Sequence, residues 1–305
     1  MNLRGCSRLN LLPYIFVLLA AILWGTVGTT QTFLKEGISP IAVAGVRSLI
    51  GGGVLLIAAL FMRKINFRKW SWKWTILAAL TIALFQSLFF TSVRFTGVAV
   101  GTVVTIGSSP VFSGIIEWAI WKSKPNRVWG IATILAIVGC ILLFVNRGEA
   151  TVHPIGVLLA LCAGFMFALY TNCSKQLTEN EETLPAVAMT FSICSIMLLP
   201  FSGDGVSWAM DKQNLFPIVF MGLAATSVAY ILFLGGLEKI SSSSAVTLSL
   251  AEPLTAALLG VFLVGEYLSP TSWVGVAMLL GGIIVLTLGS RKAHNAINEE
   301  IEPSS

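Results

Sequence analysis

The stretch PYIFVLLAAILWGTVGTTQT, residues 13–32, contains no charged side chain and has the length of a membrane-spanning helix. Such a helix needs about 20 mostly apolar residues to cross about 30 Å of hydrocarbon. Nine further stretches of similar length and character follow: 40–62, 72–93, 98–121, 126–146, 154–174, 184–201, 215–236, 244–264 and 270–289. The sequence therefore predicts an all-α membrane protein with ten transmembrane helices.

The composition agrees with this fold class. Hydrophobic residues make up 56% of the chain, charged residues only 11%, and the mean hydropathy is +0.87. A soluble domain carries about 25% charged residues. So few residues lie between the ten spans that no soluble catalytic domain fits among them.

The basic residues predict how the chain is oriented in the membrane. Of the 19 Lys and Arg residues, only Arg47 lies deep inside a predicted span. With the N-terminus in the cytoplasm, 14 of the others fall on the inside and four, Lys35, Arg94, Arg147 and Lys212, on the outside. This positive-inside bias predicts a multi-pass protein of the cytoplasmic membrane with both termini in the cytoplasm. The net charge of +5 is thereby explained by orientation in a lipid bilayer, and no nucleic-acid partner is expected.

The two halves of the chain resemble each other weakly. A shift of about 143 residues places Phe90 on Phe233 and Pro110 on Pro253, within runs of similar character. Each half has five predicted spans, so the second half must enter the membrane from the opposite side, as in transporters with inverted repeats. The expected divisions are an N-terminal cytoplasmic segment (1–12), two five-helix repeats (13–146 and 147–290) and a disordered cytoplasmic tail (291–305).

Two charged residues lie deep within predicted spans. Arg47 is about seven residues, or roughly 11 Å, into the second span, where a charge costs about 2.5–3.5 kcal/mol on insertion scales. Such a residue is expected to face the interior of the bundle and to have a partner, for which Glu252 in the ninth span is the natural candidate. Two interpretations stay open: a structural ion pair, or a site in which Arg47 holds a substrate carboxylate and Glu252 exchanges protons.

Proline, aromatic and amide residues are further candidates. Pro110 and Pro253 are expected to kink their helices, either as gating elements or simply to shape the bundle. Deep polar atoms need partners, so side chains such as Gln86 are expected to avoid lipid. The residues predicted to line a substrate cavity together with Arg47 and Glu252 are Trp24, Gln86, Phe89, Tyr170 and Tyr230. For each aromatic residue, packing in the core is the alternative.

The chain shows no motif for metal, cofactor or nucleotide chemistry. The five Cys residues are scattered without a C-x-x-C pair, and both His residues fall outside the predicted spans. There is neither an H-E-x-x-H motif nor a phosphate-binding G-x-x-x-x-G-K-[ST] loop. We therefore expect no metal, no cofactor, no use of ATP and no enzymatic activity.

Several elements in register resemble one known family. The first span carries Trp24-Gly25, the second a buried Arg47, and the ninth Glu252-Pro253, followed by the turn Gly265-Glu266 and a final span with Gly281-Gly282. Over about residues 12–289 this pattern resembles the EamA family of the drug/metabolite transporter superfamily. One departure is that Trp121-Lys122 stands in the first half where a Gly-Glu turn would map.

The resemblance implies a secondary active transporter, often an exporter, that moves a small organic metabolite by alternating access. The arginine favours a carboxylate or a zwitterion such as an amino acid, and the aromatic residues favour a bulky apolar group. A non-transporting membrane scaffold or sensor is the alternative function. The sequence sets neither the coupling ion, for which a proton is one possibility, nor the oligomeric state.

Overall fold

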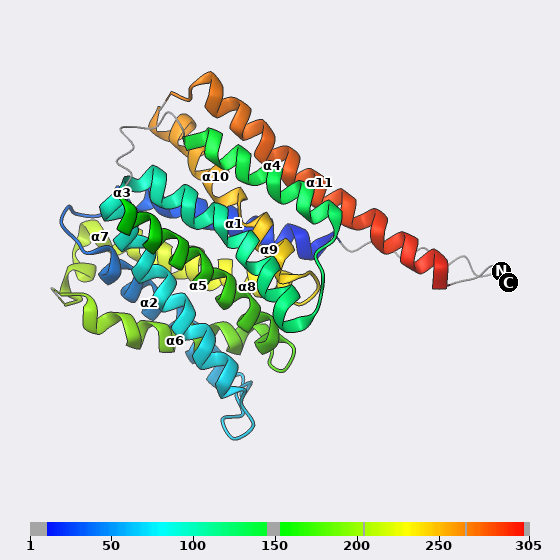
Figure 1. Ribbon diagram of the computed structural model, residues 1–305. Coiled ribbons are helices and arrows are strands. Elements are labelled where there is room, and N and C mark those ends of the chain that lie inside the picture. Colours follow the sequence, from blue (N-terminus) through cyan, green and yellow to red (C-terminus); the bar gives the residue numbers. More distant parts are fainter. Residues whose placement is uncertain (1–10, 145–152, 204, 266, 302–305) are drawn as a thin grey trace.

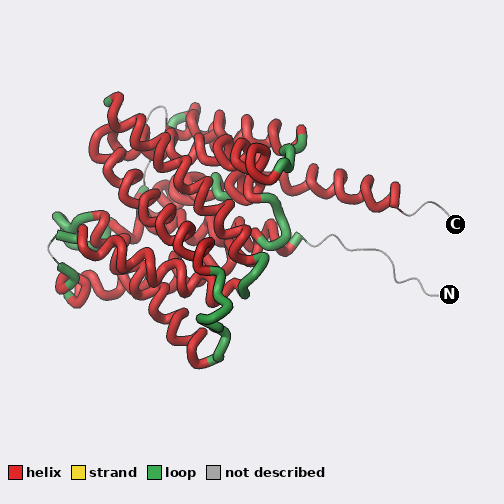
Figure 2. Tube along the Cα trace, turned by 60° about the horizontal axis from the view of Figure 1, so that its bottom comes forward, coloured by secondary structure: helices red, strands yellow, loops and turns green. Residues whose placement is uncertain are grey.

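The computed structural model describes residues 11–144, 153–203, 205–265 and 267–301. Within these ranges the chain forms helices joined by short connections and no strand (Figures 1 and 2). Asn146 and Glu266, which belong to a predicted span and to the Gly-Glu turn, lie outside the described residues.

The helices of the first half follow the predicted spans closely. They are α1 (Leu12–Gln31), α2 (Pro40–Phe61), α3 (Trp72–Trp121) and α4 (Arg127–Phe144). Two predicted helices are merged in α3, which has 50 residues and a single non-helical position, Gly97, with φ 77° and ψ 164°. Glycine alone adopts this backbone conformation without steric cost. Gly97 therefore divides α3 into two segments that each have the length of a span.

The helices of the second half are more often interrupted. They are α5 (Pro154–Thr178), α6 (Thr183–Leu198), α7 (Lys212–Gly222), α8 (Ala229–Leu237), α9 (Ser242–Leu248), α10 (Ala251–Leu259) and α11 (Pro270–Ile301). A π-helical segment, Leu223–Val228, joins α7 to α8, and another, Gly260–Val264, follows α10. In the described ranges nine helical stretches are long and apolar enough to cross a membrane. Because α3 contains two segments, this agrees with the predicted ten.

The end of α11 corrects one expectation. The sequence predicted a disordered tail from Arg291, whereas α11 continues to Ile301 and leaves the bundle as a straight extension (Figure 1). Between these residues the sequence RKAHNAINEEI contains no Gly or Pro and several good helix formers. Helix propensity therefore extends the last span beyond its apolar part.

The packing of α4 on α11 shows the inverted repeat at the level of single residues. A Cβ on Gly139 would lie 2.8 Å from the carbonyl oxygen of Gly275, and one on Gly282 would lie 2.8 Å from that of Ala132. Adding 143 to Gly139 and Ala132 gives Gly282 and Gly275, so the two contacts exchange under the repeat. The same exchange relates α1 packed on α8 and α10 to α5 packed on α3. The predicted inverted repeat is confirmed.

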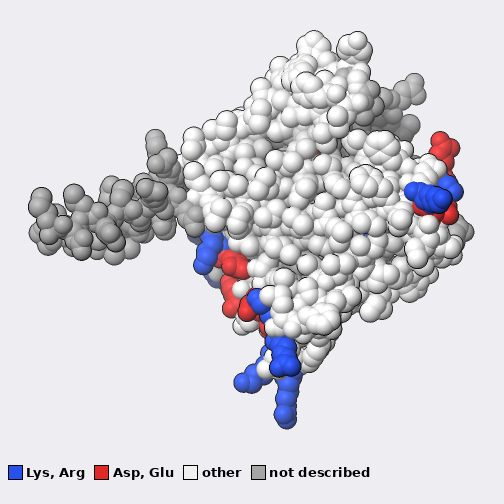
Figure 3. All heavy atoms as spheres, turned by 180° about the vertical axis from the view of Figure 1, so that it is seen from behind, with Lys and Arg blue, Asp and Glu red and all other residues white. Residues whose placement is uncertain are grey.

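Charged side chains gather at two ends of the bundle and leave a broad uncharged band between them (Figure 3). We call one end the basic end; its Lys and Arg residues are Arg63, Lys64, Arg68, Lys69, Lys73, Lys122, Lys124, Arg127, Lys175 and Lys239. The opposite end has Lys35, Arg94 and Lys212 among the described residues. The uncharged band is the part of the surface that suits the bilayer.

Polar contacts tie the two halves together at both ends. At the basic end Lys64 pairs with Glu182 at 2.5 Å, and the backbone N–H of Ser71 donates to Glu181 at 2.8 Å. At the opposite end Lys35 pairs with Asp211 at 2.8 Å, and its backbone N–H donates to Asn214 at 3.0 Å. These contacts therefore hold the two halves together at both ends of the side of the bundle that contains α2, α6 and α7.

Candidate functional site

Arg47 lies near the start of α2 and points to an amide rather than to a carboxylate. Its Nη2 donates a hydrogen bond of 2.7 Å to Oε1 of Gln86, a buried residue of α3. The Nε2 of Gln86 lies 3.5 Å from the Sγ of Cys194 on α6. A guanidinium group has five N–H donors, and this is the one side-chain hydrogen bond of Arg47 within the described ranges. Arg47 is half-buried, so its remaining donors are available to a ligand.

Glu252 lies where the ninth span is interrupted. Residues 249 and 250 form a turn between α9 and α10, and the backbone N–H of Glu252 donates to the carbonyl of Ser249 at 2.9 Å. Pro253 has no N–H to continue the helical ladder, which accounts for the break. The carboxylate of Glu252 therefore sits in the first turn of α10, where the helix dipole favours a negative charge.

The ion pair between Arg47 and Glu252 that the sequence left as one alternative does not form. The ion pairs among the described residues are Lys35 with Asp211 and Lys64 with Glu182. Both residues nevertheless lie beside the bundle centre, because Gln86 links Arg47 to Cys194 on α6, and α1 packs against the backbone of Glu252 at Gly25. The arrangement thus places a cationic and an anionic group in one region without neutralising them against each other by direct contact.

Gly25 brings α1 against the broken helix. A Cβ at Gly25 would lie 2.8 Å from the carbonyl oxygen of Glu252 and 2.6 Å from the Cβ of Thr255, closer than real side chains approach. Only glycine permits this crossing of α1 and α10. The Trp-Gly element of the sequence therefore has two roles, since Gly25 contacts the first turns of α10 and Trp24 points into the core.

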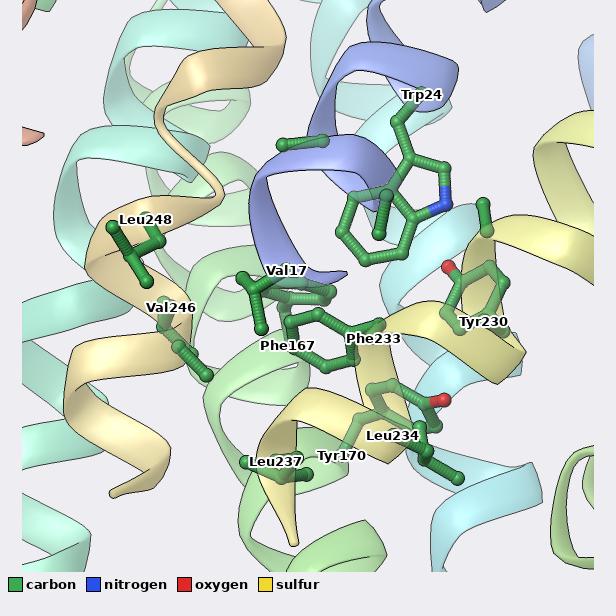
Figure 4. Close-up of a cluster of buried hydrophobic side chains, with 14 of the residues drawn as sticks. Val17, Trp24, Phe167, Tyr170, Tyr230, Phe233, Leu234, Leu237, Val246 and Leu248 are labelled. Carbon is green, nitrogen blue, oxygen red and sulfur yellow. The ribbon is translucent and has the colours of Figure 1, made fainter. Parts of the chain in front are cut away.

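Trp24 lies in a cluster of aromatic rings from α1, α5 and α8 (Figure 4). Its ring centroid is 4.8 Å from that of Tyr230, 5.1 Å from Phe233 and 6.2 Å from Phe167, and Tyr170 lies 5.9 Å from Tyr230. The indole Nε1 of Trp24 is buried and has no hydrogen-bond partner among the described residues. An unsatisfied buried donor costs about 1–3 kcal/mol, so this nitrogen favours a ligand or water that accepts a hydrogen bond.

The structure brings most of the predicted site residues together. Trp24, Tyr170 and Tyr230 belong to the aromatic cluster, and Phe89 reaches it through Phe85, whose ring centroid is 6.0 Å from Phe89 and 5.1 Å from that of Phe167. Sequence reasoning missed Phe85, Phe167 and Phe191 as members of the site. Phe191 lies 4.2 Å from Tyr230. No motif marks these three, because their neighbours come from other helices.

The two predicted gating prolines differ in their surroundings. The break in the ninth span accompanies Pro253, whereas α3 keeps helical dihedral angles through Pro110 and departs from them only at Gly97. The residue that matches Glu252 in the first half is Ser109, whose hydroxyl donates to the carbonyl of Thr105 at 2.7 Å. The carboxylate at this position therefore belongs to one repeat only.

Two hollows open at the opposite end, away from Arg47 and Glu252. One, with a volume of about 270 Å³, is lined by residues that include Lys35, Trp208 and Asn214. The other, with a volume of about 420 Å³, is lined by Thr91, Arg94 and Phe95 on α3. The charged residues of the candidate site lie deeper in the bundle than either hollow.

Comparison with known proteins gives consistent matches. The EamA-like transporter family model matches residues 11–145 and again residues 154–288, once in each half. The uncharacterized transporter YwfM of Bacillus subtilis (strain 168) is 44% identical over 283 residues, which cover 92% of this chain and 96% of the relative. The uncharacterized inner membrane transporter YicL of Salmonella typhimurium is 26% identical, with coverage of 96% and 99%. A solved crystal structure shares the fold, with a TM-score of 0.79 at 17% identity over 92% of this chain and 98% of that one.

Proposed function

The chain belongs to the EamA-like transporter family, and on this premise we propose that it exports a small organic metabolite by alternating access. Its relatives are named as transporters and it is a multi-pass membrane protein. The solute that we propose carries a carboxylate, as an amino acid or a related zwitterion does. The coupling ion that we propose is the proton.

The observation that supports a carboxylate is the state of Arg47. An arginine within the membrane is costly unless a partner compensates its charge. Here its hydrogen-bond partner is the neutral amide of Gln86, which orients the guanidinium group without neutralising it. A planar guanidinium group binds a carboxylate through two parallel hydrogen bonds. The solute would supply the missing negative charge.

Two further observations support a zwitterion with an apolar group. Glu252 is half-buried and forms no ion pair within the described ranges, so it is available to a cationic amine or to a proton. Trp24 and Tyr230 present aromatic faces and polar atoms beside this region (Figure 4). Aromatic faces attract both apolar groups and cations.

We propose that the basic end faces the cytoplasm. The positive-inside rule concerns Lys and Arg in short loops near the ends of spans, which describes most basic residues at this end. The solute would then enter from the basic end and leave at the opposite end. A non-transporting scaffold would bind no solute at Arg47, and a sensor would bind one without moving it across the membrane.

Ligand binding by the purified protein tests this proposal. A ligand that binds the folded state raises the apparent melting temperature by mass action, so the protein is screened against a panel of amino acids and other small carboxylates. We expect at least one solute to stabilise the parent protein, and the Arg47→Ala variant to lose this stabilisation. The matched control is Arg94→Ala, which removes an exposed arginine at the opposite end and should keep it.

Transport of the stabilising solute in reconstituted vesicles then separates a carrier from a sensor. Uptake that depends on Arg47 supports the proposal. The proposal is wrong if no solute stabilises the protein, or if the stabilising solute is bound but never crosses the membrane.

A further inference from the structure

Two segments that match under the inverted repeat differ sharply in burial. In α9 and the turn after it, all nine residues from 242 to 250 are buried. The matching residues, 143 positions earlier, are 99–107 in the second segment of α3. Of these only Gly101, Thr105 and Gly107 are buried, and the other six are partly exposed. A lipid-facing side accounts for part of this difference, and packing accounts for the rest, because α9 packs against α5 whereas, among the described residues, α1, which matches α5, does not pack closely against α3.

The buried segment begins with four serines, residues 241–244, which we call the tetraserine turn. The Oγ of Ser241 accepts the N–H of Ser244 at 3.2 Å and caps α9. Glu117, from the second segment of α3, accepts the backbone N–H of Ser243 at 3.2 Å. The segment therefore starts with a bond to a charged side chain from the other half of the protein.

A second charged residue holds the chain just before the tetraserine turn. The ammonium group of Lys175 on α5 donates to the carbonyl oxygens of Leu237 at 2.6 Å and of Ile240 at 2.9 Å. Both Glu117 and Lys175 are half-buried, and a cation beside the last carbonyls of a helix also suits the helix dipole of α8. Together the two residues hold α3 and α5 against the chain at the basic end of α9.

The matching turn at the opposite end has no such closure. It contains Gly97, where an added Cβ would meet nothing within 4 Å, and Val98, whose exposed fraction is 66%. The position that matches Glu117 is Gly260, which has no side chain to offer. The hollow of about 420 Å³ at Thr91, Arg94 and Phe95 lies beside this turn. Among the described residues no hydrogen bond reaches residues 97–100 from another helix.

We infer that this structure is the state closed at the basic end and open at the opposite end, and that Glu117 and Lys175 with the tetraserine turn form the basic-end gate. In the other state the two repeats exchange conformations. Residues 242–250 then become accessible and residues 99–107 become buried. This inference rests on the proposed alternating access, in which the same site is exposed to each side in turn.

A matched pair of cysteine variants tests the assignment. Ala245 is fully buried, and Thr102, its repeat partner 143 positions earlier, is partly exposed. A charged, membrane-impermeant thiol reagent reacts only with thiols that reach water, so it also separates a cavity from a lipid-facing surface. In vesicles with both faces accessible we expect Thr102→Cys to react at least about tenfold faster than Ala245→Cys, with the parent chain as blank. Equal rates, or the reverse order, would overturn the assignment of the state.

The gate itself is tested by adding Glu117→Gln to each cysteine variant. Replacing the carboxylate by an amide weakens the charge-assisted hydrogen bond from the Ser243 N–H, which exists only in the closed gate, and should shift the equilibrium about tenfold. The rate at Ala245→Cys should then rise while the rate at Thr102→Cys falls. The matched control is Glu36→Gln, which removes an exposed carboxylate that contacts neither Lys175 nor the tetraserine turn. It should leave both rates unchanged.

Other outcomes contradict the gate. If both rates rise together, Glu117 is a structural contact whose loss loosens the protein, and if neither changes, the turn is no gate. Lys175→Met removes the second contact and provides the same reciprocal test should Glu117→Gln fail to fold. Labelling requires no transport, so reciprocal rates in a protein that moves no tested solute would contradict the proposed function and leave the gate standing.

Discussion

Arg47 illustrates how much a single charge in a span reveals. Its cost in the membrane marks it in the sequence as a residue with a role. Its partner could not be read in the same way, because Glu252 and Gln86 are both plausible until the neighbours of α2 are known. The structure decides for Gln86, and the guanidinium group is oriented by an amide that leaves its charge uncompensated.

Glu252 is the residue for which we expect a role in proton coupling. A carboxyl group that binds and releases a proton in each cycle makes transport depend on pH, and an amide of the same shape cannot do so. We expect Glu252→Gln to abolish the pH dependence of solute transport in reconstituted vesicles, measured between about pH 5 and pH 8.

The control for Glu252 is Glu36→Gln, a carboxylate at the opposite end that lies outside the aromatic cluster and the bundle centre. This variant should keep the pH profile of the parent protein. An unchanged profile in Glu252→Gln would remove proton exchange at this residue from the mechanism.

At the scale of elements, glycine decides where helices cross. α2 crosses the π-helical segment Leu223–Val228 at Gly51, where an added Cβ would lie 2.6 Å from the carbonyl oxygen of Gly222. The π segment leaves carbonyl groups without their usual helical donors. The hydroxyls of Thr226 and Ser227 donate to carbonyls five residues earlier, and that of Ser227 also lies 3.0 Å from the carbonyl of Gly51. The π segment therefore depends on a glycine at position 51, which leaves room for the close approach and accepts the hydrogen bond of Ser227.

Two glycines of the same run predict opposite outcomes. Gly51→Ala should destabilise the protein by about 1–3 kcal/mol, because the methyl group would force α2 away from Gly222. Gly53→Ala places its methyl group in open space, so it should be neutral or stabilise the helix by up to about 1 kcal/mol. Unfolding in detergent measures both, and equal stability of the two variants would contradict this account of the crossing.

The interruptions of helices were only partly predictable. Pro253 signals a break because proline has no N–H to donate, and the break is found at residues 249 and 250, within one helical turn before it. Pro110 sends the same signal, yet α3 stays helical there and departs from helical angles at Gly97 instead. The π segments have no signal of this kind in the sequence, because they depend on packing against neighbouring helices and not on the backbone preferences of their own residues.

For the whole molecule, parity is the strongest sequence argument. Five spans in each half force the halves to insert in opposite directions, and the contacts of Gly139 and Gly282 show the resulting pseudo-symmetry. The symmetry is broken in two respects that matter for function. Glu252 has only Ser109 as its counterpart, and the tetraserine turn is closed where its counterpart at Gly97 is open.

The even number of spans predicts where the two ends of the chain lie. Both ends of the chain should lie on the same side of the membrane, and the positive-inside rule places that side in the cytoplasm. Epitope tags at Met1 and at Ser305 should both be protected from antibody in intact cells and exposed in permeabilised cells. A tag at residue 205, in the connection before α7, should be exposed without permeabilisation. Protection of only one terminal tag would exclude ten spans.

The sequence by itself determined the spans, their number and the opposed insertion of the two halves. These properties depend on the length and polarity of local stretches, because a bilayer of fixed thickness sets how many apolar residues a spanning helix needs. Only the tertiary structure decided that Gln86 orients Arg47, which rings surround Trp24, and which of two matching turns is closed. Those features depend on which helices are neighbours, and side chains far apart in the chain meet only after the helices have packed.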